Sequence, residues 1–103
     1  MDEPAQPQSE PRILGGNIEL HGFSMLDGGS MIVLKKIIGN YARKFSDTYG
    51  TQRLKLHLST TENKYFLSGS AHRDGSETLA EHADTNIFFL VDAVLKKLEH
   101  NLQ

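Results

Sequence analysis

Residues 84–102 read DTNIFFLVDAVLKKLEHNL, and this stretch decides the fold. Its apolar side chains recur at three- and four-residue steps, which places them on one stripe of an α-helix. The stripe contains Ile87, Val91, Val94, Leu95, Leu98 and Leu102. Asp84 can accept a hydrogen bond from the first turn, so it is expected to cap the helix. The stretch therefore predicts an amphipathic helix that needs an apolar surface to cover.

The preceding residues can supply that surface as a sheet with a second helix. Alternating apolar and polar residues predict strands, a longer three- and four-residue repeat predicts a helix, and Gly15-Gly16 and Asp74-Gly75 predict turns. In chain order we expect a strand at 17–22, a helix at 30–47, and strands at 53–59, 64–72 and 76–82. The last strand is the most polar and is expected at an edge. Gly39, inside the first helix, either allows close packing or is simply tolerated.

This order, β-α-β-β-β-α, predicts an α+β two-layer sandwich, with both helices on one face of a four-stranded sheet. The chain of 103 residues has room for one domain, at 12–103. Residues 1–11, MDEPAQPQSEP, combine acids with prolines, so we expect a disordered tail, with screening of a basic patch as the alternative.

Charge and composition limit the classes of function. The net charge is −2, and three of the thirteen acids lie in residues 1–11, which leaves residues 12–103 near neutral. Any nucleic-acid site must therefore be a local patch. The chain has no cysteine, no apolar run of membrane-spanning length and no secretory signal, so we expect a cytoplasmic protein without disulfides.

Two motifs, together with the element order, carry a resemblance to a known family. Residues 13–20 read ILGGNIEL, and residues 86–102 read NIFFLVDAVLKKLEHNL, with Asp92, Lys97 and Leu98 at the family spacings. The chain from Ile13 to Gln103 thereby resembles the short ribosome hibernation promoting factors and the related ribosome-associated inhibitor A. Because it ends at Gln103 without a further dimerisation domain, it resembles a short form, expected to be a monomer, with a homodimer as the alternative.

The resemblance implies a fold like that of double-stranded-RNA-binding domains and a stress-response role as a translation inhibitor. The partner would be ribosomal RNA of the small subunit, in the channel that messenger and transfer RNA use. The chain is less basic than expected for this family and lacks its lysine-rich end. The residues implied in RNA contact are Lys35, Lys36, Arg43 and Lys44 on the first helix, Lys96 and Lys97 on the second, and, less directly, Arg53 and Lys55.

Two features of the expected helices can be interpreted from their residues alone, without the resemblance to the family. Lys36 and Arg43 fall two helical turns apart on one face and could neutralise phosphates, although an ordinary solvated face has the same pattern. Phe89 falls on the polar side of its helix, where it would stack on a base, cover a protein partner, or be buried by a neighbouring segment.

Catalysis is not expected from this sequence. The five histidines show no metal-ligand spacing, although His21, His57 and His72 could meet across neighbouring strands. Glu77, Glu81 and Asp84 are explained by solvent exposure and helix capping. We therefore expect no enzyme, cofactor, metal, membrane or small-molecule substrate. The alternative to the ribosomal role is a protein-interaction module of the same fold that does not bind ribosomal RNA.

Overall fold

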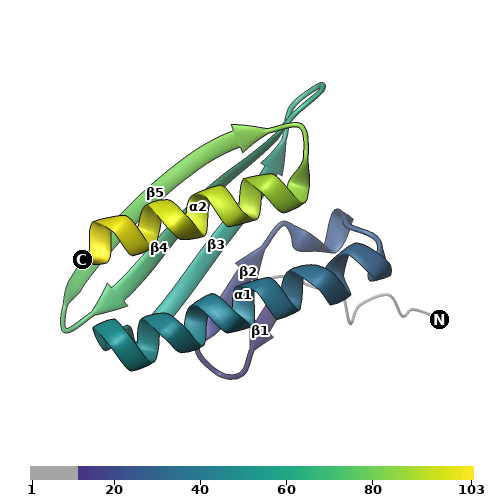
Figure 1. The fold of residues 1–103 in the computed structure, drawn as a ribbon. Helices are drawn as coiled ribbons and strands as arrows, with labels where there is room; N and C mark the ends of the chain where they lie inside the picture. The colour runs from purple at the N-terminus through teal and green to yellow at the C-terminus, as the bar shows by residue number, and fades with distance from the viewer. Residues whose placement is uncertain (1–11) are drawn as a thin grey trace.

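The computed structural model describes residues 12–103, so the tail expected at 1–11 lies outside the described residues. The strands are β1 (Arg12–Leu14), β2 (Ile18–His21), β3 (Arg53–Thr60), β4 (Tyr65–Arg73) and β5 (Ser76–Asp84). The helices are α1 (Gly28–Tyr49) and α2 (Ile87–Leu102), with a short 3-10 helix η2 (Phe23–Met25) before α1. Figure 1 shows α1 and α2 side by side on one face of the sheet. The expected α+β class is confirmed.

The sheet has five strands, so the expected number of four was wrong. Its order is β1-β2-β3-β4-β5, with β2 and β3 parallel and the other pairs antiparallel. The additional strand β1 pairs with β2 across the Gly15-Gly16 turn, where both glycines have positive φ angles. Three residues are too few to show an alternating pattern, so β1 depends on its pairing with β2.

Helix α2 covers the sheet with the predicted stripe, and all six of its apolar residues are buried. Its start differs from the expectation. The side chain of Asn86 caps the helix by accepting hydrogen bonds from the backbone N–H groups of Phe88 and Phe89, at 2.9 and 3.0 Å. Asp84 is the last residue of β5, because its pairing with Tyr65 extends the strand two residues beyond the expected end at residue 82.

Helix α1 is two residues longer at each end than expected. Asp27 caps it, accepting from the backbone N–H and the hydroxyl of Ser30 at 3.0 and 2.7 Å. These hydrogen bonds hold the pKa of the Asp27 carboxyl below its usual value. Gly39 does not mediate close packing, since a Cβ added there would meet no atom within 4 Å. The alternative that Gly39 is tolerated is therefore correct.

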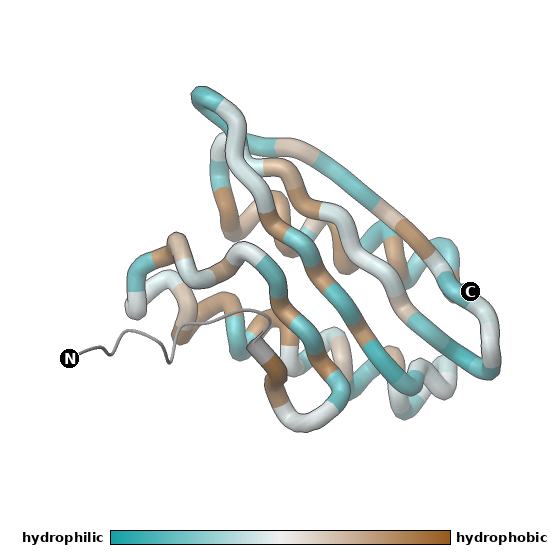
Figure 2. The backbone as a smooth tube through the Cα atoms, turned by 180° about the vertical axis from the view of Figure 1, so that it is seen from behind, coloured by the Kyte–Doolittle hydropathy of each residue, from teal (hydrophilic) through white to brown (hydrophobic). Residues whose placement is uncertain are grey.

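The face of the sheet away from the helices is uncovered by any other described element. Figure 2 shows this open face, with polar and apolar residues alternating along the strands. On β3, Leu54, Leu56 and Leu58 are buried under the helices, while the residues between them point to the open face. β5 lies at the edge of the sheet, as expected. Neither helix in this part of the chain is both long and apolar enough to cross a membrane.

Candidate nucleic-acid interface

The outward side of α1 carries three cations that have no partner within residues 12–103. Lys35, Lys36 and Arg43 are exposed and make no hydrogen bond or ion pair there. Lys36 and Arg43 lie seven residues apart, so they stand almost above one another, two helical turns apart. Asp47 is the only acid in the helix itself. The side of α1 facing away from the sheet is therefore a local basic surface on a nearly neutral domain.

Two polar contacts join α1 to α2. Lys44 forms an ion pair with Glu99, and the hydrogen bond it donates to Glu99 raises the pKa of the lysine ammonium. The Tyr41 hydroxyl donates to Asp92 at 3.1 Å. Burial and this hydrogen bond raise the pKa of Tyr41 to about 12. Lys44 is therefore part of the contact between the helices, and Glu99 offsets its charge.

The two lysines of α2 also have partners. Lys96 forms an ion pair with Asp92 one turn earlier, at 3.1 Å. Lys97 points to β5, where its ammonium donates to the carbonyl of Glu81 at 3.0 Å and lies 3.0 Å from Nδ1 of His82. Both lysines remain exposed. The charge available to an RNA phosphate is nevertheless smaller on α2 than on α1.

Arg53 and Lys55 lie on the other side of the molecule from the helices. They alternate along β3 with buried leucines, so they project from the open face. Lys55 lies 3.6 Å from Glu19 on β2. The nine residues expected at an RNA site thus divide between two opposite surfaces. One flat RNA surface cannot contact both sets at once.

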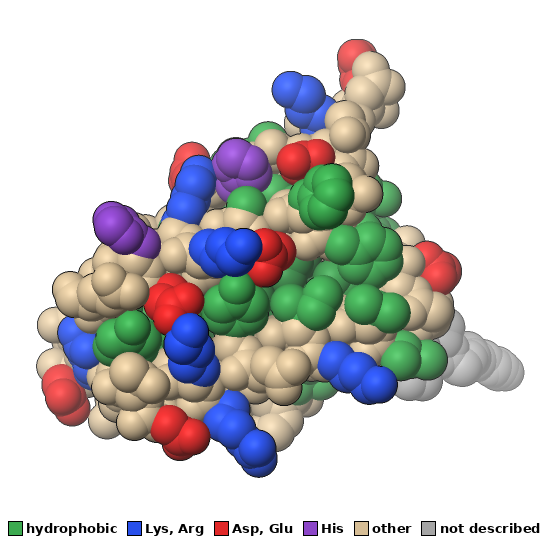
Figure 3. Space-filling model, in the orientation of Figure 1, with side chains coloured by type: hydrophobic (Ala, Val, Ile, Leu, Met, Phe, Trp, Pro, Cys, Tyr) green, Lys and Arg blue, Asp and Glu red, His purple; other side chains and the backbone are tan. Residues whose placement is uncertain are grey.

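Phe89 is exposed, with 68% of its surface accessible, so of the alternatives for this residue, burial by a neighbouring segment was wrong. Hydrophobic side chains gather over the helix layer of the molecule (Figure 3). We call the set of Val33, Ile37, Phe88 and Phe89 the apolar strip. Val33 is exposed, whereas Ile37 and Phe88 are partly buried against the core. Sequence reasoning missed Val33, although its position in the apolar run Met31-Ile32-Val33-Leu34, wider than one helical stripe, was a usable signal.

The histidines only partly come together. His21 and His57 stack on the open face, with ring centroids 5.5 Å apart, while His72 lies beside Glu77 at 3.2 Å. A hydrogen bond with His21, together with the charge of Lys55, lowers the pKa of Glu19. No group of three or more His, Cys, Asp or Glu side chains in residues 12–103 is arranged to hold a metal ion.

Comparison with models of known protein families found no match, and neither did comparison with curated proteins. The resemblance to ribosome hibernation factors therefore stays a prediction. The basic outer side of α1 and the apolar strip are the two features of the helix layer from which a function can be argued.

Proposed function

We propose that this protein binds ribosomal RNA through the outer side of α1 and represses translation. In this proposal it docks on the small ribosomal subunit in the cytoplasm and blocks messenger and transfer RNA by occupying their channel. It acts by binding alone, as a hibernation factor with a fold like that of double-stranded-RNA-binding domains. The element order β2-α1-β3-β4-β5-α2 is consistent with that fold once β1 is set aside.

One observation carries the proposal, namely the three exposed cations of α1 that lack an acidic partner in the described chain. A lysine already paired with a carboxylate must lose that contact before it can neutralise a phosphate. Lys35, Lys36 and Arg43 have no such contact to lose within residues 12–103. They can therefore neutralise phosphates and release counterions from RNA without first breaking an ion pair.

The test is co-sedimentation with purified small ribosomal subunits across a salt series. Reversing the charge of Lys36 and Arg43 together should weaken binding and reduce the slope of log K against log salt by about 1.5, since each phosphate contact contributes roughly 0.7–0.9. Lys64→Glu is the matched control for the single variant Lys36→Glu, because exposed Lys64 lies in the turn between β3 and β4, away from α1. If Lys36→Glu and Lys64→Glu weakened subunit binding equally, the assignment of the RNA-binding surface to α1 would be refuted.

A second candidate function is suggested by the exposure of Phe89. A phenylalanine at 68% exposure on a helix layer where hydrophobic side chains gather is typical of a surface that a protein partner covers (Figure 3). Under this alternative, Phe89→Ala abolishes partner binding, and salt has little effect. Subunit binding that depends on Lys36 and Arg43 but survives Phe89→Ala would exclude it as the main function.

A further inference from the structure

The open face of the sheet has an uneven distribution of charge across its strands. β3 contributes two cations, Arg53 and Lys55, together with His57. β5, two strands away, contributes Glu77, Leu79 and Glu81. β4 lies between them and contributes only small or neutral groups near the centre, such as Ser68 and Ser70. One side of the open face is therefore basic, and the other is acidic.

A shallow groove of about 210 Å³ lies over β4. Its floor is formed by Ser68, Gly69 and Ser70, and its walls include Lys55 and His57 on one side and Leu79 on the other. Leu79, in the middle of β5, is 63% exposed. The groove and the exposed Leu79 therefore form an uncovered surface between the basic and the acidic side of the open face.

We propose that a second copy of this chain packs on the open face, related by a two-fold axis that runs parallel to β4. Such an axis places β3 of one copy over β5 of the other, twice, as a closed isologous dimer requires. The strand register aligns Arg53 with Glu77 across His72, and His57 with Glu81 across Ser68. Arg53 therefore faces Glu77 of the second copy, and His57 faces its Glu81.

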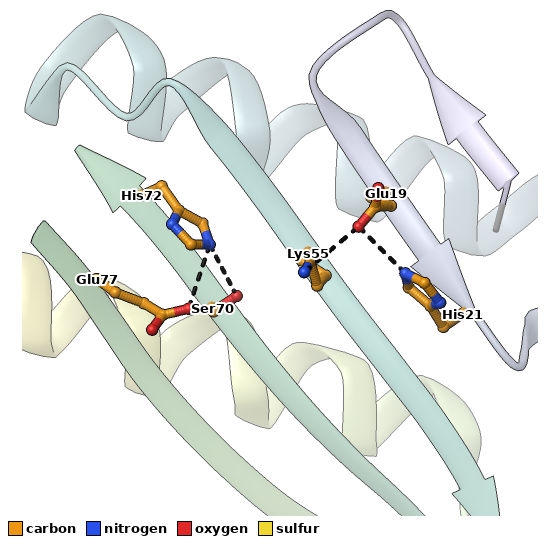
Figure 4. A network of polar contacts seen from close by, with 6 residues as sticks. All are labelled: Glu19, His21, Lys55, Ser70, His72 and Glu77. Atoms are coloured by element: carbon orange, nitrogen blue, oxygen red, sulfur yellow. Dashed lines mark hydrogen bonds and ion pairs between the residues drawn. The ribbon is translucent and has the colours of Figure 1, made fainter. Parts of the chain in front are cut away.

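The charged side chains of the open face make contacts within the chain but remain partly exposed. Figure 4 shows Lys55 directed to Glu19 and His72 directed to Glu77 on the open face. The side chains of Lys55 and Glu77 nevertheless keep 44% and 47% of their surface exposed. Each can make a further contact while it retains its first one, and Leu79 of each copy would be buried in the process.

The size of the face sets the expected affinity. The three strands β3, β4 and β5, with eight or nine residues at about 3.3 Å each and a spacing of about 4.8 Å, give roughly 400 Å² per copy. A standard interface buries about 800 Å² per partner, so the dimer should be weak. The helix layer offers no comparable match, since Asp92 and Glu99 are already paired with lysines and Asp47 is the single other acid of α1 and α2.

The test combines sedimentation equilibrium of the full chain with two charge variants. The parent mass should rise with concentration from 11.5 kDa toward twice that value, and more so at low salt. One variant carries Arg53→Glu and Lys55→Glu, and the other carries Glu77→Lys and Glu81→Lys. Each variant alone would place like charges together, so its dimer dissociation constant should rise about tenfold or more. An equimolar mixture of the two should form a dimer again, because each basic face then meets an acidic one.

The mixture keeps the proposal falsifiable if one variant is merely less stable, because restored association requires both to be folded. Circular dichroism of each variant verifies this directly. A parent that stays at 11.5 kDa at millimolar concentration would overturn the proposal. So would a dimer that survives both charge variants but is lost in Phe89→Ala, since association would then use the apolar strip. Failure of two folded variants to associate when mixed would also count against the two-fold arrangement.

Discussion

Gly69 lies on β4 directly beneath α2, and the packing there leaves no space for a side chain. A Cβ at this position would lie 2.9 Å from Cδ2 of Leu56, 3.0 Å from Cγ1 of Val94 and 3.1 Å from Cδ1 of Leu98. We expect Gly69→Ala to lower the free energy of unfolding by about 1–3 kcal/mol, because the packed side chains of Leu56, Val94 and Leu98 must move aside. Urea denaturation measures this change.

Gly39 supplies the matched control for the same substitution. An added methyl group at Gly39 meets nothing within 4 Å, and alanine is the better helix former. Gly39→Ala should therefore raise the free energy of unfolding by about 0.5–1 kcal/mol. If both alanine variants changed stability in the same direction, the close approach of α2 to β4 would not be the cause.

Tyr41 gives the fold a specific dependence on alkaline pH. Its pKa is about 12 in the folded protein, against an ordinary value of 10.0. Between these values the unfolded chain releases the phenolic proton while the folded protein retains it, so stability falls as pH rises through this window. Tyr41→Phe should flatten that fall, which urea midpoints from pH 8 to 11.5 would measure. Parallel curves for parent and variant would show that Tyr41 makes no contribution.

At the scale of single elements, the start of α2 can be tested directly. Asn86 accepts two hydrogen bonds from the first turn, whereas Asp84 accepts one, from the backbone N–H of Asn86. Asn86→Ala should therefore cost about 1 kcal/mol of stability, and Asn86→Asp should retain most of it because aspartate is an equally good cap. Asp84→Ala should cost less. A larger loss from Asp84→Ala than from Asn86→Ala would mean that the helix begins earlier.

Features that depend on neighbouring residues could be predicted from the sequence, and features that depend on distant ones could not. The stripe of α2 and the alternation of β3 follow from local spacing, so both were predicted. The cap of α2 was misplaced because β5 is extended by its pairing with β4. The candidate RNA site shows the same division. The sequence predicts which lysines lie on α1. It does not predict that Lys44 forms an ion pair with Glu99, because the two residues are 55 positions apart in the chain.

At the scale of the whole molecule, the two proposals use opposite faces of a two-layer protein. A dimer formed through the open faces would leave both helix layers outward, so each copy could still bind RNA. At physiological salt, charges are screened over about 8 Å, and the effect of a sheet-face substitution on α1 should be small. We therefore expect Arg53→Glu with Lys55→Glu to raise the dimer dissociation constant about tenfold or more, while changing the affinity for a short RNA duplex less than about threefold. Reversing the charges of Lys36 and Arg43 should instead weaken RNA binding and leave dimerisation unchanged. Fluorescence anisotropy with a duplex of about 16 base pairs, long enough for one double-stranded-RNA-binding domain, measures the RNA affinity, and sedimentation measures dimerisation. If either variant lost both properties while remaining folded, the two faces would act as one site.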